Sequence, residues 1–298
     1  MMKSLFFRLI VLIVALSGSL VAKDDVAIVC IFQNEAPWIK EWIEFHKLQG
    51  VKHFYLYNNN SDDNYMEVLQ PYIEKDLVTL KDWKYTYDYA DHGHWIAIQT
   101  GAYVDCIKHY GKEMDWLAAI DTDEFLYTTG GQKLGEFLKK YHNYGGIAVN
   151  WVKFGTSGVE DFEPNKLMIE VLTQCAKYNN HQNKFIKSIV QPKYVSDCRS
   201  PHCFRYVEGK YAVNADGEKV RSTRSEIIHL SKIRINHYWT RSKKYLLEEK
   251  IPSRQKRRDA WSTERILAMC AEFEIIKDTN ILQFVEPLRK KMGFTEDK

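Results

Sequence analysis

The sequence has no strong excess of charge of either sign. Its 42 lysine and arginine residues nearly balance 39 aspartate and glutamate residues, which leaves a net charge of +3 at pH 7 over 298 residues. Domains that bind nucleic acid through their charge carry a clear excess of basic residues. The balance gives no basis for a nucleic-acid partner, and we expect none.

Cysteine is too sparse for a disulfide scaffold. The six cysteines are compatible with an oxidising compartment but do not form a dense framework. Cys198 and Cys203 flank a short loop and can form a disulfide, with Cys175 as a competing partner for one of them. Cys198, His202 and Cys203 lack the spacing of a zinc site.

A hydrophobic run of membrane-spanning length is also missing. The apolar run at the N-terminus covers residues 9–16, follows Lys3 and Arg8, and is succeeded by small residues up to Ala22. A basic start, a short apolar centre and a small-residue exit are typical of a secretory signal. A spanning helix needs about 20 apolar residues. We interpret residues 1–22 as a signal peptide or weak membrane anchor, which predicts a secreted, secretory-pathway or membrane-associated protein.

Internal repeats, low-complexity segments and a clear linker are absent as well. A chain of this length can bury a sizeable core as one large domain with appendages. We expect that domain over residues 23–260. The helical pattern that begins near Tyr245 predicts a C-terminal helical extension over residues 261–298.

Strand and helix patterns alternate through the first half. The continuous apolar run at residues 26–32 indicates a strand buried on both faces. A periodic helix over 38–48, a strand over 53–57, a long helix over 95–110 and a strand over 116–120 follow. This alternation predicts an α/β fold with a mostly parallel central sheet flanked by helices. Further strands, some antiparallel, are expected over residues 184–192 and 227–235.

Polar side chains follow three of these strands. Asn34 and Glu35 follow the first, residues 58–63 follow the second, and Asp121 and Asp123 follow the strand at 116–120. Ligands of open parallel sheets bind beyond the carboxyl ends of the strands. An Asp-x-Asp pair on a strand points to one side and can hold a divalent cation that leaves positions open for phosphates. The alternative is an ordinary strand end that turns into a solvated loop.

The order and spacing of several blocks resemble glycosyltransferase family 92, whose members have a GT-A fold. One block is the Ile-Asp-Thr-Asp-Glu-Phe-Leu run at residues 120–126, and the last contains Asn236, His237, Tyr238 and Trp239. The blocks together cover roughly residues 26–254, at positions 31–35, 38–46, 54–63, 99–106, 116–126, 151–158, 187–192 and 235–243.

The resemblance implies a nucleotide-diphospho-sugar transferase of GT-A type that uses Mn²⁺ or Mg²⁺. Such an enzyme would move a hexose, with galactose expected, from a UDP-sugar to a glycan or other hydroxyl acceptor, with inversion. Asp123 would bind the cation directly, Asp121 would contact the ribose side or a metal-bound water, and His237 would complete the metal site. We therefore expect Asp123 and His237 to lie within reach of one cation. The implied contacts to the donor are Asn34, Glu35, Asp62, Gln99, Asp121 and Lys243, with Arg241, Lys250 and Arg254 near the diphosphate.

Ordinary structural roles are also open for several of these side chains. Glu35 can be a helix N-terminal acid and Asp62 a turn former. His237 can be a core histidine beside Tyr238, and the basic side chains can belong to a solvated helix face.

Inversion requires a general base for the acceptor hydroxyl. Glu160 and Asp161, which follow the loop at residues 155–158, are our candidates, although the resemblance leads us to expect a histidine near Val159. Two other functions fit the Asp-x-Asp pair. A metal-dependent phosphohydrolase would need a denser set of carboxylate and histidine ligands. A secreted, non-catalytic carbohydrate-binding protein could share the fold.

Overall fold

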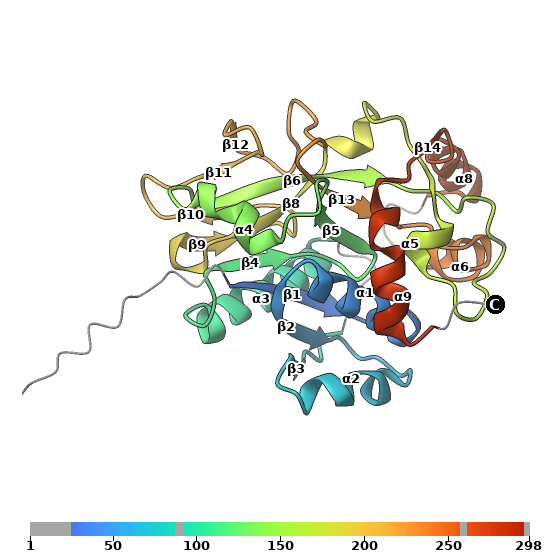
Figure 1. Cartoon of the computed structure of the whole chain (residues 1–298), viewed down its shortest axis with the longest axis horizontal. Helices are drawn as coiled ribbons and strands as arrows, with labels where there is room; N and C mark the ends of the chain where they lie inside the picture. Colours follow the sequence, from blue (N-terminus) through green and yellow to red (C-terminus); the bar gives the residue numbers. More distant parts are fainter. Residues whose placement is uncertain (1–24, 87–91, 257–260, 295–298) are drawn as a thin grey trace, which may run out of the picture.

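The computed structural model describes residues 25–86, 92–256 and 261–294 (Figure 1). The predicted signal at residues 1–22 lies outside the described residues. No helix in the described ranges is long and apolar enough to cross a bilayer. All six cysteines are free thiols, so the candidate disulfide between Cys198 and Cys203 is not formed.

A ten-stranded sheet forms the centre of the described chain, with most strands in the order β12-β11-β6-β8-β4-β1-β2-β3. Four strands from the first half, β1, β2, β3 and β4, pair in parallel. Strand β8 runs antiparallel to both β4 and β6, so β6 points the same way as β4. These strands are β1 (Val26–Phe32), β2 (Val51–Asn58), β3 (Val78–Asp82), β4 (Trp116–Ala119), β6 (Gly146–Lys153) and β8 (Ile186–Val190).

Four more strands complete this sheet. Strand β11 is parallel to β6, and β12 closes that edge in the antiparallel direction. Strand β13 is parallel to β6 and antiparallel to β5. The predicted α/β class with a mostly parallel sheet is therefore confirmed. These strands are β5 (Glu124–Thr128), β11 (Ala212–Val213), β12 (Lys219–Val220) and β13 (Ile233–His237).

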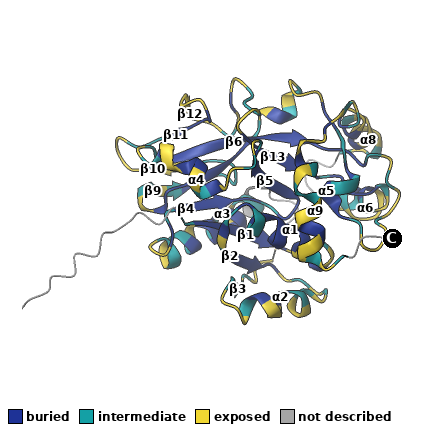
Figure 2. Cartoon of the chain, viewed as in Figure 1, coloured by how far each residue is buried: buried dark blue, intermediate teal, exposed yellow. Residues whose placement is uncertain are grey.

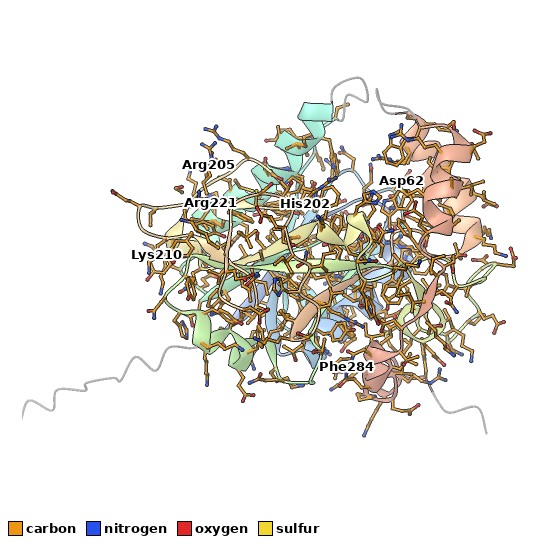
Figure 3. All side chains as sticks on the ribbon, turned by 90° about the horizontal axis from the view of Figure 1, so that it is seen from above. Asp62, His202, Arg205, Lys210, Arg221 and Phe284 are labelled. Atoms are coloured by element: carbon orange, nitrogen blue, oxygen red, sulfur yellow. The ribbon has the colours of Figure 1, made fainter. Side chains whose placement is uncertain are left out.

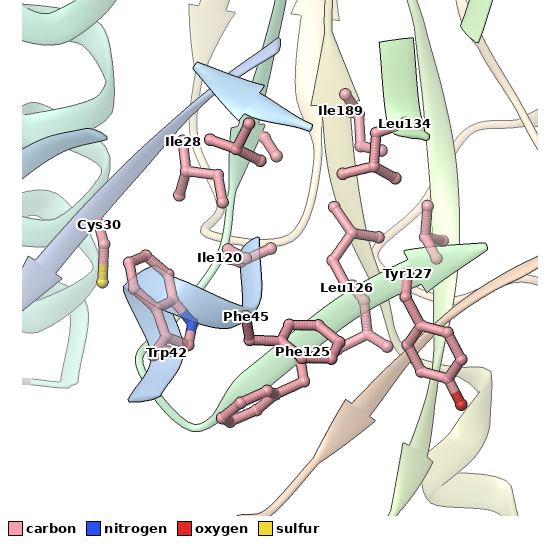
Figure 4. Close-up of a cluster of buried hydrophobic side chains, with 14 of the residues drawn as sticks. Ile28, Cys30, Trp42, Phe45, Ile120, Phe125, Leu126, Tyr127, Leu134 and Ile189 are labelled. Atoms are coloured by element: carbon pink, nitrogen blue, oxygen red, sulfur yellow. The ribbon is translucent and has the colours of Figure 1, made fainter. Parts of the chain in front are cut away.

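The core has two layers because β1 is buried on both faces (Figure 2). Val26, Ile28, Cys30 and Phe32 join the larger cluster, and the intervening residues of β1 join the smaller one. Helix α1 (Ala36–Leu48) and helix α9 (Val285–Met292) pack on the larger cluster. Helix α3 (His92–Tyr110) covers the other face. Figure 4 shows the larger cluster, in which Phe45 of α1 meets Phe125 of β5.

One expected strand begins later than predicted. Residues 227–232 are irregular, and β13 begins only at Ile233. Ile227 is 60 % exposed, and the backbone N–H of His229 donates to the side-chain oxygen of Asn150 in β6 (3.1 Å) instead of to a backbone carbonyl of a strand.

The described chain contains further helices, turns and short strands. They are α2 (Tyr65–Ile73), α4 (Leu134–Leu138), η1 (Lys139–Tyr141), α5 (Met168–Val171), β7 (Gln174–Cys175), η2 (His181–Lys184), η3 (Pro192–Tyr194), β9 (Val195–Cys198), β10 (Phe204–Tyr206), α6 (Lys243–Tyr245), the π-helical turn η4 (Leu246–Lys250), α7 (Ile251–Gln255), α8 (Thr263–Ala271), β14 (Ile276–Lys277) and η5 (Asn280–Phe284).

Candidate active site

A tight turn between β4 and β5 carries three acidic side chains. The backbone N–H of Glu124 donates to the carbonyl of Asp121 (3.1 Å), and the N–H of Asp121 donates to Oε2 of Glu124 (3.0 Å). Asp121 and Asp123 thus belong to a turn, not to the extended strand that would place them on the same side. The side chain of Asp121 is 34 % exposed, whereas that of Glu124 is fully buried.

Strand β13 brings His237 to this turn. It pairs with β5 so that His237 lies opposite Glu124, and the N–H of Tyr238 donates to the carbonyl of Asp123 (2.8 Å). His237 Nε2 lies 3.3 Å from Oδ1 of Asp123. The two side chains are thus within reach of one cation, as expected, and their roles as metal ligands stay a prediction.

Both carboxylate oxygens of Asp121 already have partners. Gln99 Nε2 donates to Oδ1 (2.9 Å), and Lys187 Nζ donates to Oδ2 (2.9 Å). Lys187 is 1 % exposed and also lies 3.5 Å from Glu124. Burial opposes the charge of Lys187, but Asp121 and Glu124 outweigh it and hold the pKa of Lys187 well above its usual value. Two predicted site residues, Gln99 and Asp121, are thus in direct contact, and Asp121 also binds a lysine to which the sequence analysis gave no role.

A second buried lysine holds the ring of His237. Lys153 Nζ lies 2.8 Å from His237 Nδ1 and 4.3 Å from the centre of the Trp151 ring. Burial lowers the pKa of Lys153 to about 7. Burial and the neighbouring Lys153 lower the pKa of His237 to about 4, so its imidazole is neutral at pH 7. The neutral ring is the form that binds metal ions.

Asp123 faces a third lysine. Lys250 of η4 lies 3.5 Å from Oδ2 of Asp123, and its ammonium group lies over the rings of Trp239 and Tyr245 at 5.1 and 5.7 Å. Burial opposes the charge of Asp123, but its hydrogen bond with the ring of His237 and the nearby ammonium of Lys250 outweigh burial and hold the pKa of Asp123 well below the usual range.

Glu124 is the most deeply buried of the three acids. Burial raises its pKa to about 8, although Lys187 acts in the opposite direction. Its Oε1 lies 3.7 Å from His237 Nδ1 and has no hydrogen-bond partner among the described residues.

Glu35, a predicted donor contact, is bound to Arg241. Arg241 Nη2 lies 2.5 Å from Oε2 of Glu35, and the Arg241 side chain is 1 % exposed, with its guanidinium over the rings of Trp38 and Tyr245. Burial raises the pKa of Glu35, and Arg241 acts against this rise. Arg241 Nε and Nη1 have no hydrogen-bond partner among the described residues. Glu35 is also the N-cap residue of α1, as the alternative interpretation expected, but its side chain makes no cap hydrogen bond and instead forms one half of a largely buried ion pair.

Asn34 joins the loops that follow β1 and β2. Its φ of 55° lies in the left-handed region, which asparagine tolerates better than most residues. Its side chain accepts from the N–H of Asp62 (2.9 Å), and its own N–H donates to Ser61 Oγ (3.0 Å). Asp62 is exposed at this edge (Figure 3), on the other side of the view from Arg205. The polar clusters after β1 and β2 therefore converge, as their topology predicts.

Three predicted residues lie apart from the buried cluster. Lys243 pairs with Glu160, and Lys244 pairs with Asp161. The side chains of Glu160 and Asp161 are 79 % and 56 % exposed, and Lys243 is 43 % exposed. No contact of the three with Asp123 or His237 is found in the described chain.

The donors at the turn fit a cation that is completed by its substrate. In the described ranges, no three histidine, cysteine or acidic side chains form a group that could hold a metal. Asp123 Oδ1 and His237 Nε2 supply two donors. Mg²⁺ is commonly held by one or two carboxylates plus substrate phosphates and water, and Mn²⁺ accepts imidazole with oxygen. A two-donor site for either cation is therefore consistent with this chemistry.

Comparison with known proteins finds a match to one protein family. The model of glycosyltransferase family 92 matches residues 26–275. A family 92 protein of Ricinus communis is 25% identical over 64% of this chain and 33% of its own length. One of Oryza sativa subsp. japonica is 29% identical over 61% of this chain and 30% of its own length. The chain therefore matches about a third of the length of these relatives.

Solved structures that align with this chain include S. aureus TarS. TarS 1–349 aligns over 92% of this chain and 75% of its own, with 10% identity and a TM-score of 0.37. Its complex with UDP-GlcNAc aligns over 83% of this chain and 70% of its own, with 10% identity and a TM-score of 0.35.

Proposed function

The chain belongs to glycosyltransferase family 92, and from this membership we propose that it transfers a hexose from a UDP-sugar to a hydroxyl group of a glycan or glycoconjugate. Galactose is the sugar we propose first, with inversion at the anomeric carbon. We also propose that residues 1–22 direct the protein to the secretory pathway or to a membrane, on the basis of their sequence pattern alone.

The observation that carries the proposal is the approach of Asp123 and His237 to 3.3 Å at the carboxyl edge of the sheet. The side chains come from segments far apart in the sequence, and parallel sheets bind their ligands at this edge. A bound Mn²⁺ or Mg²⁺ would take up negative charge that develops on a departing diphosphate.

The residues around this pair would orient it and stabilise charge. Lys153 fixes the ring of His237 through Nδ1, which leaves Nε2 facing Asp123. Lys187 and Gln99 fix Asp121. Fixed groups that need no rearrangement during the reaction stabilise a transition state most effectively.

The acceptor step needs a base on the opposite side of the sugar from the leaving group. We keep Glu160 and Asp161 as candidates because both carboxylates are accessible to an acceptor. The backbone N–H groups of Lys243 and Lys244 donate to the carbonyls of Val159 and Glu160 (2.9 and 3.0 Å). These bonds hold the segment beside the helical stretch that carries Lys250.

A donor screen tests the proposal. Purified protein would be incubated with Mn²⁺ and each of several UDP-, GDP- and dTDP-sugars, and nucleotide release would be measured with and without a mixture of glycan acceptors. We expect acceptor-stimulated UDP release from a UDP-hexose. The exposed Glu67 on α2 offers a control substitution, Glu67→Ala, that should keep full activity. Binding of a sugar without UDP or Mn²⁺ binding would instead favour the non-catalytic carbohydrate-binding alternative.

A further inference from the structure

The acidic turn is surrounded by as many basic side chains as acidic ones. Four carboxyl groups meet here, and each has a basic neighbour: Arg241 beside Glu35, Lys187 beside Asp121 and Glu124, and Lys250 beside Asp123. Lys153 is the fourth basic group and, like Glu124, contacts Nδ1 of His237. Transfer of a proton from Lys153 to Glu124 would neutralise both groups, so the net charge of the whole set would stay the same. The eight side chains, which we name the charged cluster, are Glu35, Asp121, Asp123, Glu124, Lys153, Lys187, Arg241 and Lys250.

This balance works against a divalent cation that arrives alone. The cation would gain two protein donors, Asp123 and His237, while the charge of Asp121 is already paired with Lys187. It would also lie close to Lys153 and Lys250, which contact the same two side chains through Nδ1 of His237 and Oδ2 of Asp123. Adding net positive charge to a neutral, largely buried site is costly because charges interact strongly where water is excluded.

A cation that arrives with a nucleoside diphosphate meets a different balance. The diphosphate brings negative charge of about the same size as the charge of the cation, together with oxygen ligands. The net charge of the site then stays near zero. Lys250 can exchange its contact with Asp123 for one with a phosphate oxygen.

Lys250 is the basic residue best placed to make such an exchange. Lys187 and Lys153 are 1% and 6% exposed and lie within 2.9 Å of their partners, and Arg241 is 1% exposed. Lys250 is 18 % exposed, and its ammonium lies 3.5 Å from Asp123. It closes the π-helical turn η4 between α6 and α7, a type of irregularity that often occurs at functional sites.

We infer that the divalent cation and the nucleoside diphosphate of the donor enter this site together, and that Lys250 is the counter-charge of Asp123 while the site is empty. The inference rests on the proposed function, because it concerns the donor of that reaction. It makes Lys250 a positioning residue that couples metal binding to nucleotide binding.

Binding measurements on the full chain test the inference without a reaction. Binding of Mn²⁺ alone would be followed by electron paramagnetic resonance of the free ion. Binding of UDP would be followed by calorimetry in chelator and at several Mn²⁺ concentrations. We expect Mn²⁺ alone to bind no tighter than roughly 1 mM, and saturating Mn²⁺ to tighten UDP binding by at least about tenfold. Micromolar binding of Mn²⁺ to the nucleotide-free protein would overturn the inference and leave the proposed function standing. Absence of UDP binding under every condition would instead contradict the proposed function.

A matched pair of variants isolates Lys250. Lys250→Met keeps the length and apolar contacts of the side chain but removes its charge, so Mn²⁺ should bind the nucleotide-free variant roughly tenfold more tightly than wild type. The increase of UDP affinity caused by Mn²⁺ should shrink accordingly. Lys244→Met removes an exposed ammonium from the same helical stretch and should leave both quantities unchanged. Unchanged Mn²⁺ affinity in a folded Lys250→Met protein, with folding checked by circular dichroism, would contradict the role of Lys250.

Discussion

Arg241 Nη2 lies 2.5 Å from Oε2 of Glu35 and joins two segments 206 residues apart. Glu35 directly follows the loop after β1, and Arg241 lies just beyond β13, with a φ of 49° in the left-handed region. The pair ties the N-terminal half of the sheet to the segment that leads into η4. Because the ion pair is largely buried, removal of either partner would leave the charge of the other without compensation.

Breaking this ion pair from one side should destabilise the protein. Glu35→Gln leaves the guanidinium of Arg241 buried without its counter-charge, which typically costs about 3 kcal/mol. Arg241→Met should cost a similar amount, and the double variant should cost less than the sum of the two. Urea unfolding of the four proteins measures this coupling. Strictly additive losses would show that the two charges do not depend on each other.

Acid should destabilise the protein through His46. Its Nδ1 donates to the carbonyl of Trp42 (2.8 Å), and its Nε2 accepts from the N–H of Leu126 (3.1 Å), so the ring is neutral in the folded state. Burial lowers its pKa to about 3. The unfolded chain binds this proton below about pH 6.5. The free energy of unfolding should therefore fall as the pH is lowered from about 6.5 towards 3, and the contribution of His46 to this fall is at most about 1.4 kcal/mol per pH unit.

Two histidine variants separate the contribution of His46 to the pH dependence of stability from that of other titrating groups. His46→Gln should show a shallower loss of unfolding free energy between pH 6 and 4 than wild type. His181→Gln, at an exposed position, should follow the wild-type slope. Identical slopes for wild type and His46→Gln would contradict the assignment.

Glycine is required at position 155 by the segment that follows α8. A Cβ atom there would collide with Oε1 of Glu274 and lie 2.9 Å from the carbonyl oxygen of Phe273. The same Glu274 accepts hydrogen bonds from Ser157 N (3.0 Å) and Thr156 Oγ1 (3.0 Å), so it cannot move away without loss. Gly155→Ala should lower the unfolding free energy by about 1–3 kcal/mol.

Gly130 is the matched comparison for this substitution. A Cβ there would meet nothing within 4 Å, and Gly130→Ala should change the thermal midpoint much less. Equal midpoints for the two alanine variants would mean that Glu274 does not confine the loop at residues 155–158.

The first half of the fold could be predicted from the sequence because its signals are local. The apolar run of β1, the periodic helix α1 and the polar ends of β1 and β2 each have a pattern within about ten residues. Strand β5 and the late start of β13 could not be predicted in this way. The two strands pair across about 110 positions of sequence, and their pairing depends on register.

The site was predictable in part for the same reason. The approach of His237 to Asp123 was expected from the resemblance. Lys153 and Lys187 also fall within the family-like blocks at 151–158 and 187–192, but neither the resemblance nor the strand pattern gave these two lysines a role. A lysine within an otherwise buried strand is itself a signal, since it needs a counter-charge nearby. Glu160 and Lys243 illustrate the reverse case: Glu160 was a candidate because it follows the loop at residues 155–158 and Lys243 because of the resemblance, and the structure pairs them on the surface, apart from Asp123 and His237.

The dependence of UDP release on Mn²⁺ in wild type, Asp123→Asn and His237→Ala is the most direct test of the account. We predict that wild type releases UDP from its hexose donor only with the cation, and that both variants lose at least about 100-fold of that activity. Both should keep the wild-type circular dichroism spectrum. Full UDP release by folded Asp123→Asn, or by wild type in excess chelator, would contradict a cation held by these two side chains.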